Sequence, residues 1–204
     1  MNARTLPKLQ VLILAAGFSS RLGRPKALAR VHGSSLLRRT LTLMARFASA
    51  RIAVVLPRHG ARYRIEARGF NVAFIPNSRR ADGLSSSVRH GIARCRYSRA
   101  ILLLPVDLAG LQQRDVAALI SRWRGAPRRV IARRLGRHGG TPLILPPWLY
   151  APARRITGDI GLRDLVARLP AEQRLLVNLP SAALDVDTPE DLRTARRRLR
   201  RTSH

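Results

Sequence analysis

Three aspartates occupy positions in this sequence that could support chemistry on a phosphate group. Only 11 of the 204 residues are acidic, and none of these precedes Glu66. Asp107 follows the apolar run AILLLPV, and Asp185 and Asp187 stand just before the last helix-like segment. Mg²⁺ in proteins usually takes one or two carboxylates together with substrate phosphates. We therefore expect Asp107 and Asp187 to hold Mg²⁺, whereas strand alternation turns Asp185 to the opposite side and gives it a structural role.

Lys26 is unusual because the 39 basic residues comprise 37 arginines and only 2 lysines. A lysine side chain is a compact point charge, whereas the arginine guanidinium is a planar fork. A lysine retained among so many arginines indicates that a point charge is needed at this position. We expect Lys26 and Arg21 to supply positive charge to phosphate groups.

The loop that contains Lys26 follows an apolar run in VLILAAGFSSRLGRPKAL, residues 11–28. It fits neither the G-x-x-x-x-G-K-[ST] phosphate loop nor the G-x-G-x-x-G dinucleotide fingerprint. The small residues Ala15, Ala16 and Gly17 allow backbone N–H groups to approach a ligand closely, and Ser19 adds polar reach. The alternative is an ordinary turn between a strand and a helix, with its cations in solvent.

Composition excludes several classes of protein. The formal net charge is +28, but the basic residues are spread along the chain and no basic motif interleaved with aromatic residues is present, so nucleic-acid binding is not favoured. No apolar run approaches the ~20 residues of a membrane span. With one cysteine, no metal-ligand spacing and no signal peptide, we expect a cytoplasmic protein without a membrane partner.

Apolar runs alternate with helical patterns along the whole chain. Strand-like runs include residues 9–16, 51–57, 71–76, 99–107, 128–134, 141–146 and 174–179, and helical patterns include residues 34–48, 60–68, 84–95, 112–124, 159–169 and 188–201. This alternation predicts an α/β fold, a Rossmann-like and mostly parallel sheet with helices on both faces. We expect one domain over residues 1–204, with its ligands at the carboxyl ends of the strands.

Six segments in the same order resemble the nucleotidyltransferases with the nucleotide-diphospho-sugar transferase fold. LAAGFSSRLGRPKAL is similar to their L-A-A-G-x-x-x-R-[ML]-G-x-x-K signature, and DVDTPEDL matches D-[IV]-D-T-P-E-D-L. The others are GLSSSVRHGI, LLLPVDLAGL, GGTPLIL and TGDIGLRDL. Among these enzymes the chain is most similar to the MobA-like molybdenum cofactor cytidylyltransferases and their guanylyltransferase relatives.

The resemblance implies transfer of CMP from CTP to a pterin-type molybdenum cofactor, with Mg²⁺ and release of pyrophosphate. Under this reaction Lys26 and Arg21 would neutralise the triphosphate and, together with Asp107, carry the catalysis. It implies that CTP is preferred to GTP, because Ala16 stands where guanylyltransferases tend to have glycine, and that Ser87 contacts the base. The nucleotide would then be bound by Leu14, Ala15, Ala16, Gly17, Ser19, Arg21, Lys26 and Ser87. The acceptor would be bound by Gly140, Asp159 and Arg163.

Departures from the family pattern leave the acceptor open. Ala109 replaces the usual proline after the metal aspartate, Thr141 replaces histidine, and Leu162 replaces alanine. Guanylyl transfer to the same cofactor and transfer to a sugar or polyol phosphate remain alternatives. In another class, the chain could deliver a nucleotide or cofactor without turnover, or bind nucleic acid. A recipient molybdoenzyme or its chaperone is a further candidate partner.

Overall fold

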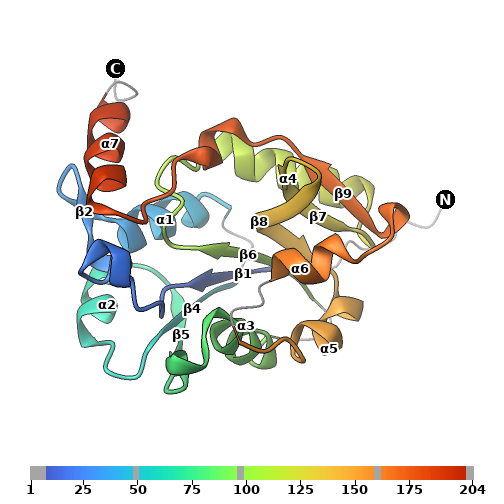
Figure 1. The fold of residues 1–204 in the computed structure, drawn as a ribbon, viewed down its shortest axis with the longest axis horizontal. Coiled ribbons are helices and arrows are strands. Elements are labelled where there is room, and N and C mark those ends of the chain that lie inside the picture. The colour runs from blue at the N-terminus through green and yellow to red at the C-terminus, as the bar shows by residue number, and fades with distance from the viewer. Residues whose placement is uncertain (1–7, 48–50, 96–98, 159–161, 201–204) are drawn as a thin grey trace.

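The computed structural model describes residues 8–47, 51–95, 99–158 and 162–200. A seven-stranded sheet in the order β5-β4-β1-β6-β8-β7-β9 forms its centre (Figure 1). Only β8 runs antiparallel to its neighbours. The strands are β1 Lys8–Leu14, β4 Arg51–Pro57, β5 Val72–Asn77, β6 Arg99–Pro105, β7 Val130–Leu135, β8 His138–Leu145 and β9 Arg174–Val177. A separate two-stranded ribbon pairs β2 Arg30–Val31 with β3 Ser34–Ser35.

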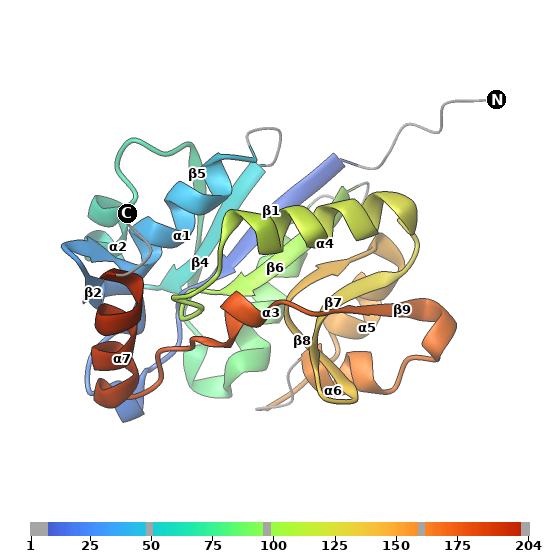
Figure 2. The same cartoon turned by 90° about the horizontal axis from the view of Figure 1, so that it is seen from above.

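Helices cover both faces of the sheet, as Figures 1 and 2 show. One buried cluster contains residues of β1, α1, α2, α4 and α7, and the other contains residues of β1, α3, α5 and α6. Successive residues of β1 alternate between the two clusters, as expected for a strand buried on both faces. The helices are α1 Leu36–Ala45, α2 Ala61–Glu66, α3 Leu84–Ala93, α4 Gln113–Gly125, α5 Tyr150–Ala153, α6 Leu162–Ala167 and α7 Pro189–Arg200.

The predicted α/β fold with a mostly parallel sheet and helices on both faces is confirmed. Two local expectations differ from the structure. The helical pattern that begins at Ser34 first forms β3, because Ser34 pairs with Val31, and Ser35 then caps α1 by accepting a hydrogen bond from the Arg38 backbone N–H. The expected strand at residues 141–146 begins earlier, at His138, because it pairs in a hairpin with β7.

The carboxyl ends of β1, β4, β5 and β6 meet at one edge of the sheet, because these four strands are parallel. The loop after β1, the loop after β6 and the start of α3 therefore lie close together. No helix among the described residues is long and apolar enough to cross a membrane.

Candidate active site

The loop after β1 is folded around Ser19. It contains two single-turn 3-10 helices, Ser20–Leu22 and Lys26–Leu28. Ser19 adopts the left-handed conformation with φ of 57°, and its Oγ accepts a hydrogen bond of 3.0 Å from the backbone N–H of Lys26. This bond closes the loop, so Ser19 fixes the position from which the Lys26 side chain extends.

Lys26 Nζ lies between two carboxylates from distant parts of the chain. It donates to Asp107 Oδ2 at 2.9 Å and also to Asp187 Oδ1. Arg21 reaches the other oxygen of Asp187, with an Nη2–Oδ2 distance of 3.2 Å. The lysine side chain and that of Asp107 are mostly buried, whereas Arg21 is largely exposed. The structure thus brings together the four charged residues that the sequence assigned to catalysis and metal binding.

Asp187 is brought to Asp107 because residues 184–187 run beside the loop that follows β6. The backbone N–H of Val186 donates to the Asp107 carbonyl at 3.0 Å, and that of Gly110 donates to the Leu184 carbonyl at 3.3 Å. A Cβ at Gly110 would overlap the carbonyl oxygen of Ser181. Glycine at this position is therefore needed for the two segments to approach each other.

The start of α7 holds the backbone of Asp187 in place. Asp191 Oδ2 accepts hydrogen bonds from the backbone N–H groups of Asp187, at 3.1 Å, and Thr188, at 2.8 Å. The Thr188 hydroxyl caps the helix in return by accepting from the Asp191 N–H. Hydrogen bonds from the Thr188 side chain and backbone, aided by that of Asp187, lower the pKa of Asp191. Asp187 stands directly before this cap.

The charged cluster changes the pKa of two of its members. Burial alone would lower the pKa of Lys26, but the charges and hydrogen bonds of Asp107 and Asp187 outweigh it, so the pKa is raised and the lysine stays protonated. Burial and the nearby carboxylates raise the pKa of Asp185, although Arg133 at 3.7 Å acts against them. The position between the Asp107 and Asp187 carboxylates therefore stabilises a cation.

A cavity of about 390 Å³ opens beside these residues, and we call it the Lys26 cavity. Among the described residues no histidine or cysteine lines it, and its titratable lining residues are cations and aspartates. The predicted residues that line it are Leu14, Ala15, Gly17, Ser19, Arg21, Lys26, Ser87, Asp107 and Asp187. Leu84 and Thr141 also line it. Asp185 lines it too, so the expectation that Asp185 points away from Asp187 is wrong, because residues two apart in an extended segment point to the same side.

Ser87 is oriented by a residue that the sequence reasoning missed. Asn77, at the end of β5, is buried, and its Nδ2 donates to Ser86 Oγ at 2.7 Å and to Ser87 Oγ at 3.1 Å. The sequence did contain a signal for Asn77, because this amide side chain ends an apolar strand at the edge of the sheet where ligands are expected. Asn77 therefore positions the serine that faces the cavity.

Three predicted residues do not line the Lys26 cavity in the described structure, and a fourth cannot be placed there because it lies outside the described residues. Ala16 is buried in the cluster on the α3 side of the sheet. Gly140 is buried in β8, where a Cβ would overlap the Leu135 side chain. Arg163 is exposed on α6, and Asp159 lies outside the described residues. The roles of these four in base choice and acceptor binding stay predictions.

The side chains present fit a divalent cation that also binds phosphate. Among the described residues no group of three or more His, Cys, Asp and Glu side chains is arranged to hold a metal by itself. Two carboxylates nevertheless converge on the single cation Lys26 Nζ. This donor set is what Mg²⁺ uses when substrate phosphates supply the other oxygens.

Comparison with known proteins identifies the family of the chain. A family model described as the MobA-like NTP transferase domain matches residues 11–174. The chain belongs to this family. The match includes Lys26 and Asp107 and ends before Asp187, so the contact of Asp187 with Lys26 extends the site beyond the matched residues.

Three relatives illustrate the range of this similarity. A probable molybdenum cofactor guanylyltransferase of Rhodopirellula baltica is 29% identical over 198 residues, which is 91% of this chain and 90% of that protein. A phosphoenolpyruvate guanylyltransferase of Rubrobacter xylanophilus is 32% identical over 112 residues, 54% of this chain and 55% of that protein. Rv0371c of Mycobacterium tuberculosis H37Rv, also solved in complex with manganese, has 26% identity and a TM-score of 0.74, covering 93% of this chain and 98% of its own.

Proposed function

We propose that this NTP transferase transfers a nucleoside monophosphate to the phosphate group of a pterin-type molybdenum cofactor. The observation that carries the proposal is the convergence of Lys26, Asp107 and Asp187 at the carboxyl edge of the sheet. The Rhodopirellula baltica relative, which is named for the same cofactor and aligned over most of both chains, supports the choice of acceptor.

In the proposed reaction an oxygen of the acceptor phosphate attacks the α-phosphorus of the nucleotide. The new P–O bond forms as the bond to the β-phosphate breaks, and pyrophosphate leaves with the electron pair. Asp107 and Asp187 would hold Mg²⁺, which when bound neutralises charge on the phosphates. Lys26 stabilises the charge that develops at the reacting phosphate, and Arg21 anchors the exposed end of the triphosphate.

We propose GTP as the nucleotide, in place of the CTP that the sequence motif favours. Both curated relatives described above are named guanylyltransferases, although one aligns with only 54% of this chain. Cytidylyl transfer is the second candidate, because the motif retains Ala16. The Ala16 methyl is 1% exposed and packed in the core, so it does not crowd a base in the cavity directly. Base selection is then expected to depend on Ser87, which Asn77 orients.

The decisive experiment incubates the protein with each of the four nucleoside triphosphates, the molybdenum cofactor, and Mg²⁺ or Mn²⁺, and measures pyrophosphate release. We expect release with GTP that requires the cofactor and the metal. Pyrophosphate release with CTP but not with GTP, in the presence of the cofactor and the metal, would support the cytidylyl alternative. Release with phosphoenolpyruvate or a sugar phosphate in place of the cofactor would change the acceptor, and nucleotide binding without any release would indicate a delivery factor.

A pair of substitutions tests base choice. We compare kcat/KM for the preferred nucleotide with kcat/KM for the other of the pair GTP and CTP. Ser87→Ala should lower this ratio by about tenfold, because one hydrogen bond to the base is lost. Ala16→Gly should leave that ratio unchanged if the core-facing methyl is only structural. A changed ratio in Ala16→Gly would restore the selectivity role that the motif predicts.

Gly140, Asp159 and Arg163 are proposed to lie on the acceptor side, on the evidence of the family motif. We further propose a cytoplasmic protein that acts as one nucleotidyltransferase domain and passes its product to a molybdoenzyme or its chaperone. Arg163→Ala tests the acceptor side, since it should raise the KM for the cofactor and leave the KM for the nucleotide unchanged.

A further inference from the structure

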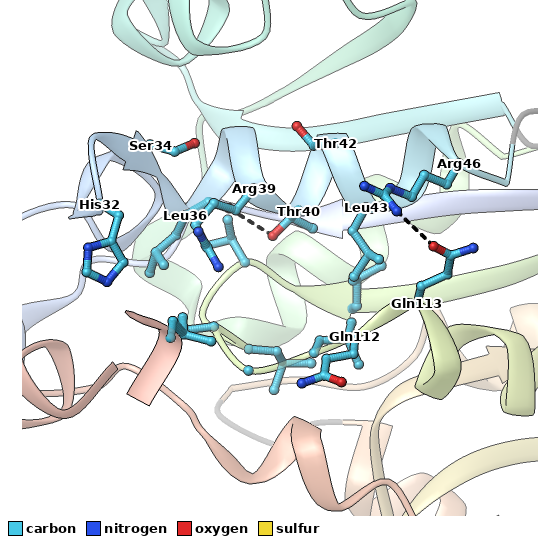
Figure 3. A pocket seen from close by; sticks show the side chains of 17 residues that line it. His32, Ser34, Leu36, Arg39, Thr40, Thr42, Leu43, Arg46, Gln112 and Gln113 are labelled. Atoms are coloured by element: carbon cyan, nitrogen blue, oxygen red, sulfur yellow. Dashed lines mark hydrogen bonds between the residues drawn. The ribbon is translucent and has the colours of Figure 1, made fainter. Parts of the chain in front are cut away.

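A second cavity, of about 610 Å³, lies behind the loop that carries Asp107. We call it the Arg39 cavity. Figure 3 shows it between α1, which supplies Arg39 and Leu43, and the loop and helix start that supply Gln112 and Gln113. Its volume is in the range of cavities that hold small organic ligands. Nothing in the proposed reaction uses it.

The lining of the Arg39 cavity combines apolar and cationic side chains. Leu36, Leu43 and Leu104 supply apolar surface, and Arg39 and Arg46 supply positive charge. Among the described residues no aspartate or glutamate lines it. A cavity of this composition is complementary to an anion that has an apolar body.

Arg39 contributes an unpartnered side-chain atom to this cavity. Its Nε atom is buried and has no hydrogen-bond partner among the described residues. Burial lowers the pKa of Arg39. By contrast, the neighbouring Arg46 is bonded to Gln113 Oε1 at 2.9 Å. Figure 3 shows the Arg39 guanidinium pointing from α1 toward the loop, into the cavity.

The Arg39 cavity and the Lys26 cavity share part of their walls. Val106 and Leu108, the two neighbours of Asp107, line both cavities. A ligand that contacts them from one side therefore acts on the segment that positions Asp107 on the other side. Any such coupling is reciprocal, because each ligand must change the affinity for the other by the same factor.

We propose that the Arg39 cavity binds a small organic anion with an apolar body, and that this ligand alters nucleotide affinity through Val106 and Leu108. The guanidinium of Arg39 pairs with the anionic group, and the leucines cover the apolar part. Binding to this cavity does not require the proposed reaction, whereas its effect on nucleotide affinity rests on the nucleotide binding that we propose for the Lys26 cavity.

The test uses 8-anilinonaphthalene-1-sulfonate, which carries one sulfonate on an apolar body, as a probe of the whole chain. Its dissociation constant is measured by fluorescence for the wild type and for Arg39→Met, which keeps an apolar side chain of similar length. We expect Arg39→Met to weaken binding by about tenfold or more, since a charge-assisted bond is lost. Saturation with GTP and Mg²⁺ should shift the dissociation constant of the wild type by at least about twofold.

Thermal unfolding without any ligand separates binding from a structural role. Arg39→Met should have an unchanged or higher Tm, because it removes a buried, unpaired donor. Arg168→Met is the matched control, since Arg168 is exposed and lies in neither cavity, and it should bind the probe as the wild type does.

Wild-type affinity in Arg39→Met, or an equal loss in Arg168→Met, would overturn the proposed site. A lowered Tm in Arg39→Met would assign the arginine to the fold. Probe binding that Arg39→Met weakens, but that is unchanged by a nucleotide shown to saturate the protein in a direct binding titration, would overturn the coupling. Absence of nucleotide binding in that titration would count against the proposed function and not against the Arg39 cavity.

Discussion

The Lys26 cavity and the Arg39 cavity meet at one loop, yet their charges are balanced differently. In the first, Lys26 and Arg21 are paired with Asp107 and Asp187. In the second, no carboxylate of the described residues faces Arg39. Paired carboxylates can exchange a side-chain cation for a metal, whereas an unpaired cation can only attract an anion. In a chain of net charge +28, the few acids mark the chemistry better than the many arginines do.

Asp107→Asn should have the largest effect, because it removes the charge balance that distinguishes the Lys26 cavity. We expect kcat to fall by about a hundredfold to a thousandfold, the range for loss of one electrostatic contact in a transition state. Pyrophosphate release across a Mg²⁺ titration measures this, with circular dichroism as a check of the fold. Near-wild-type turnover at limiting Mg²⁺ would remove Asp107 from the metal site.

Lys26→Arg sharpens the comparison by keeping the charge and changing its shape. We expect kcat to fall by about a hundredfold while nucleotide affinity changes little, since the planar guanidinium cannot occupy the position of Nζ. Arg21→Lys is the matched exchange at an exposed position and should mainly raise the KM for the nucleotide. Equal kcat values in Lys26→Arg and the wild type would mean that any cation is sufficient there.

Gly110→Ala tests the loop that both cavities share. The new Cβ would overlap Ser181 O and lie 2.8 Å from Leu184 Cβ, so we expect a loss of about 1–3 kcal/mol in the free energy of unfolding. Gly125→Ala is the control, because a Cβ at that helical position meets nothing within 4 Å and should be neutral or slightly stabilising. Urea unfolding compares the two, and equal effects would contradict the close approach.

Asp185→Asn should have the smallest effect, a slight change in stability that depends on pH. Asp185 lines the Lys26 cavity, but its carboxylate is not hydrogen-bonded to Lys26. Because the pKa of Asp185 is raised in the folded protein, the native state holds that proton more tightly than the unfolded state does. Its contribution to stability is therefore present at low pH and is lost as the pH rises through the folded pKa. We expect Asp185→Asn to be slightly more stable than the wild type near pH 7, with the difference vanishing near pH 4. Thermal unfolding across that range would show the opposite trend if the Arg133 ion pair dominated.

The sequence was sufficient to predict the fold and the charged half of the site for one physical reason. Lys26 and Asp107 lie in the loops that follow the apolar strands β1 and β6, and parallel strands bring their carboxyl ends to one edge. The direction of the Ala16 side chain could not be predicted, because the methyl turns into the core just where the strand ends. Asn77 was missed because its function lies in hydrogen bonds to serines of another element. The Arg39 cavity depends on the packing of α1 against a distant loop, which no local pattern encodes.

The docking of residues 184–187 on the loop after β6 has a consequence for how the molecule comes apart. Lys26 and Asp187 are separated by 161 positions, and what holds Asp187 in place is this short segment and the cap of α7. Local opening of the segment would disperse the charged cluster while the sheet stayed intact. The amide protons of Val186 and Gly110, which join the two segments, should then exchange with solvent sooner than those at the centres of β1 and β6. Mild denaturant would thus inactivate a protein that still looks folded.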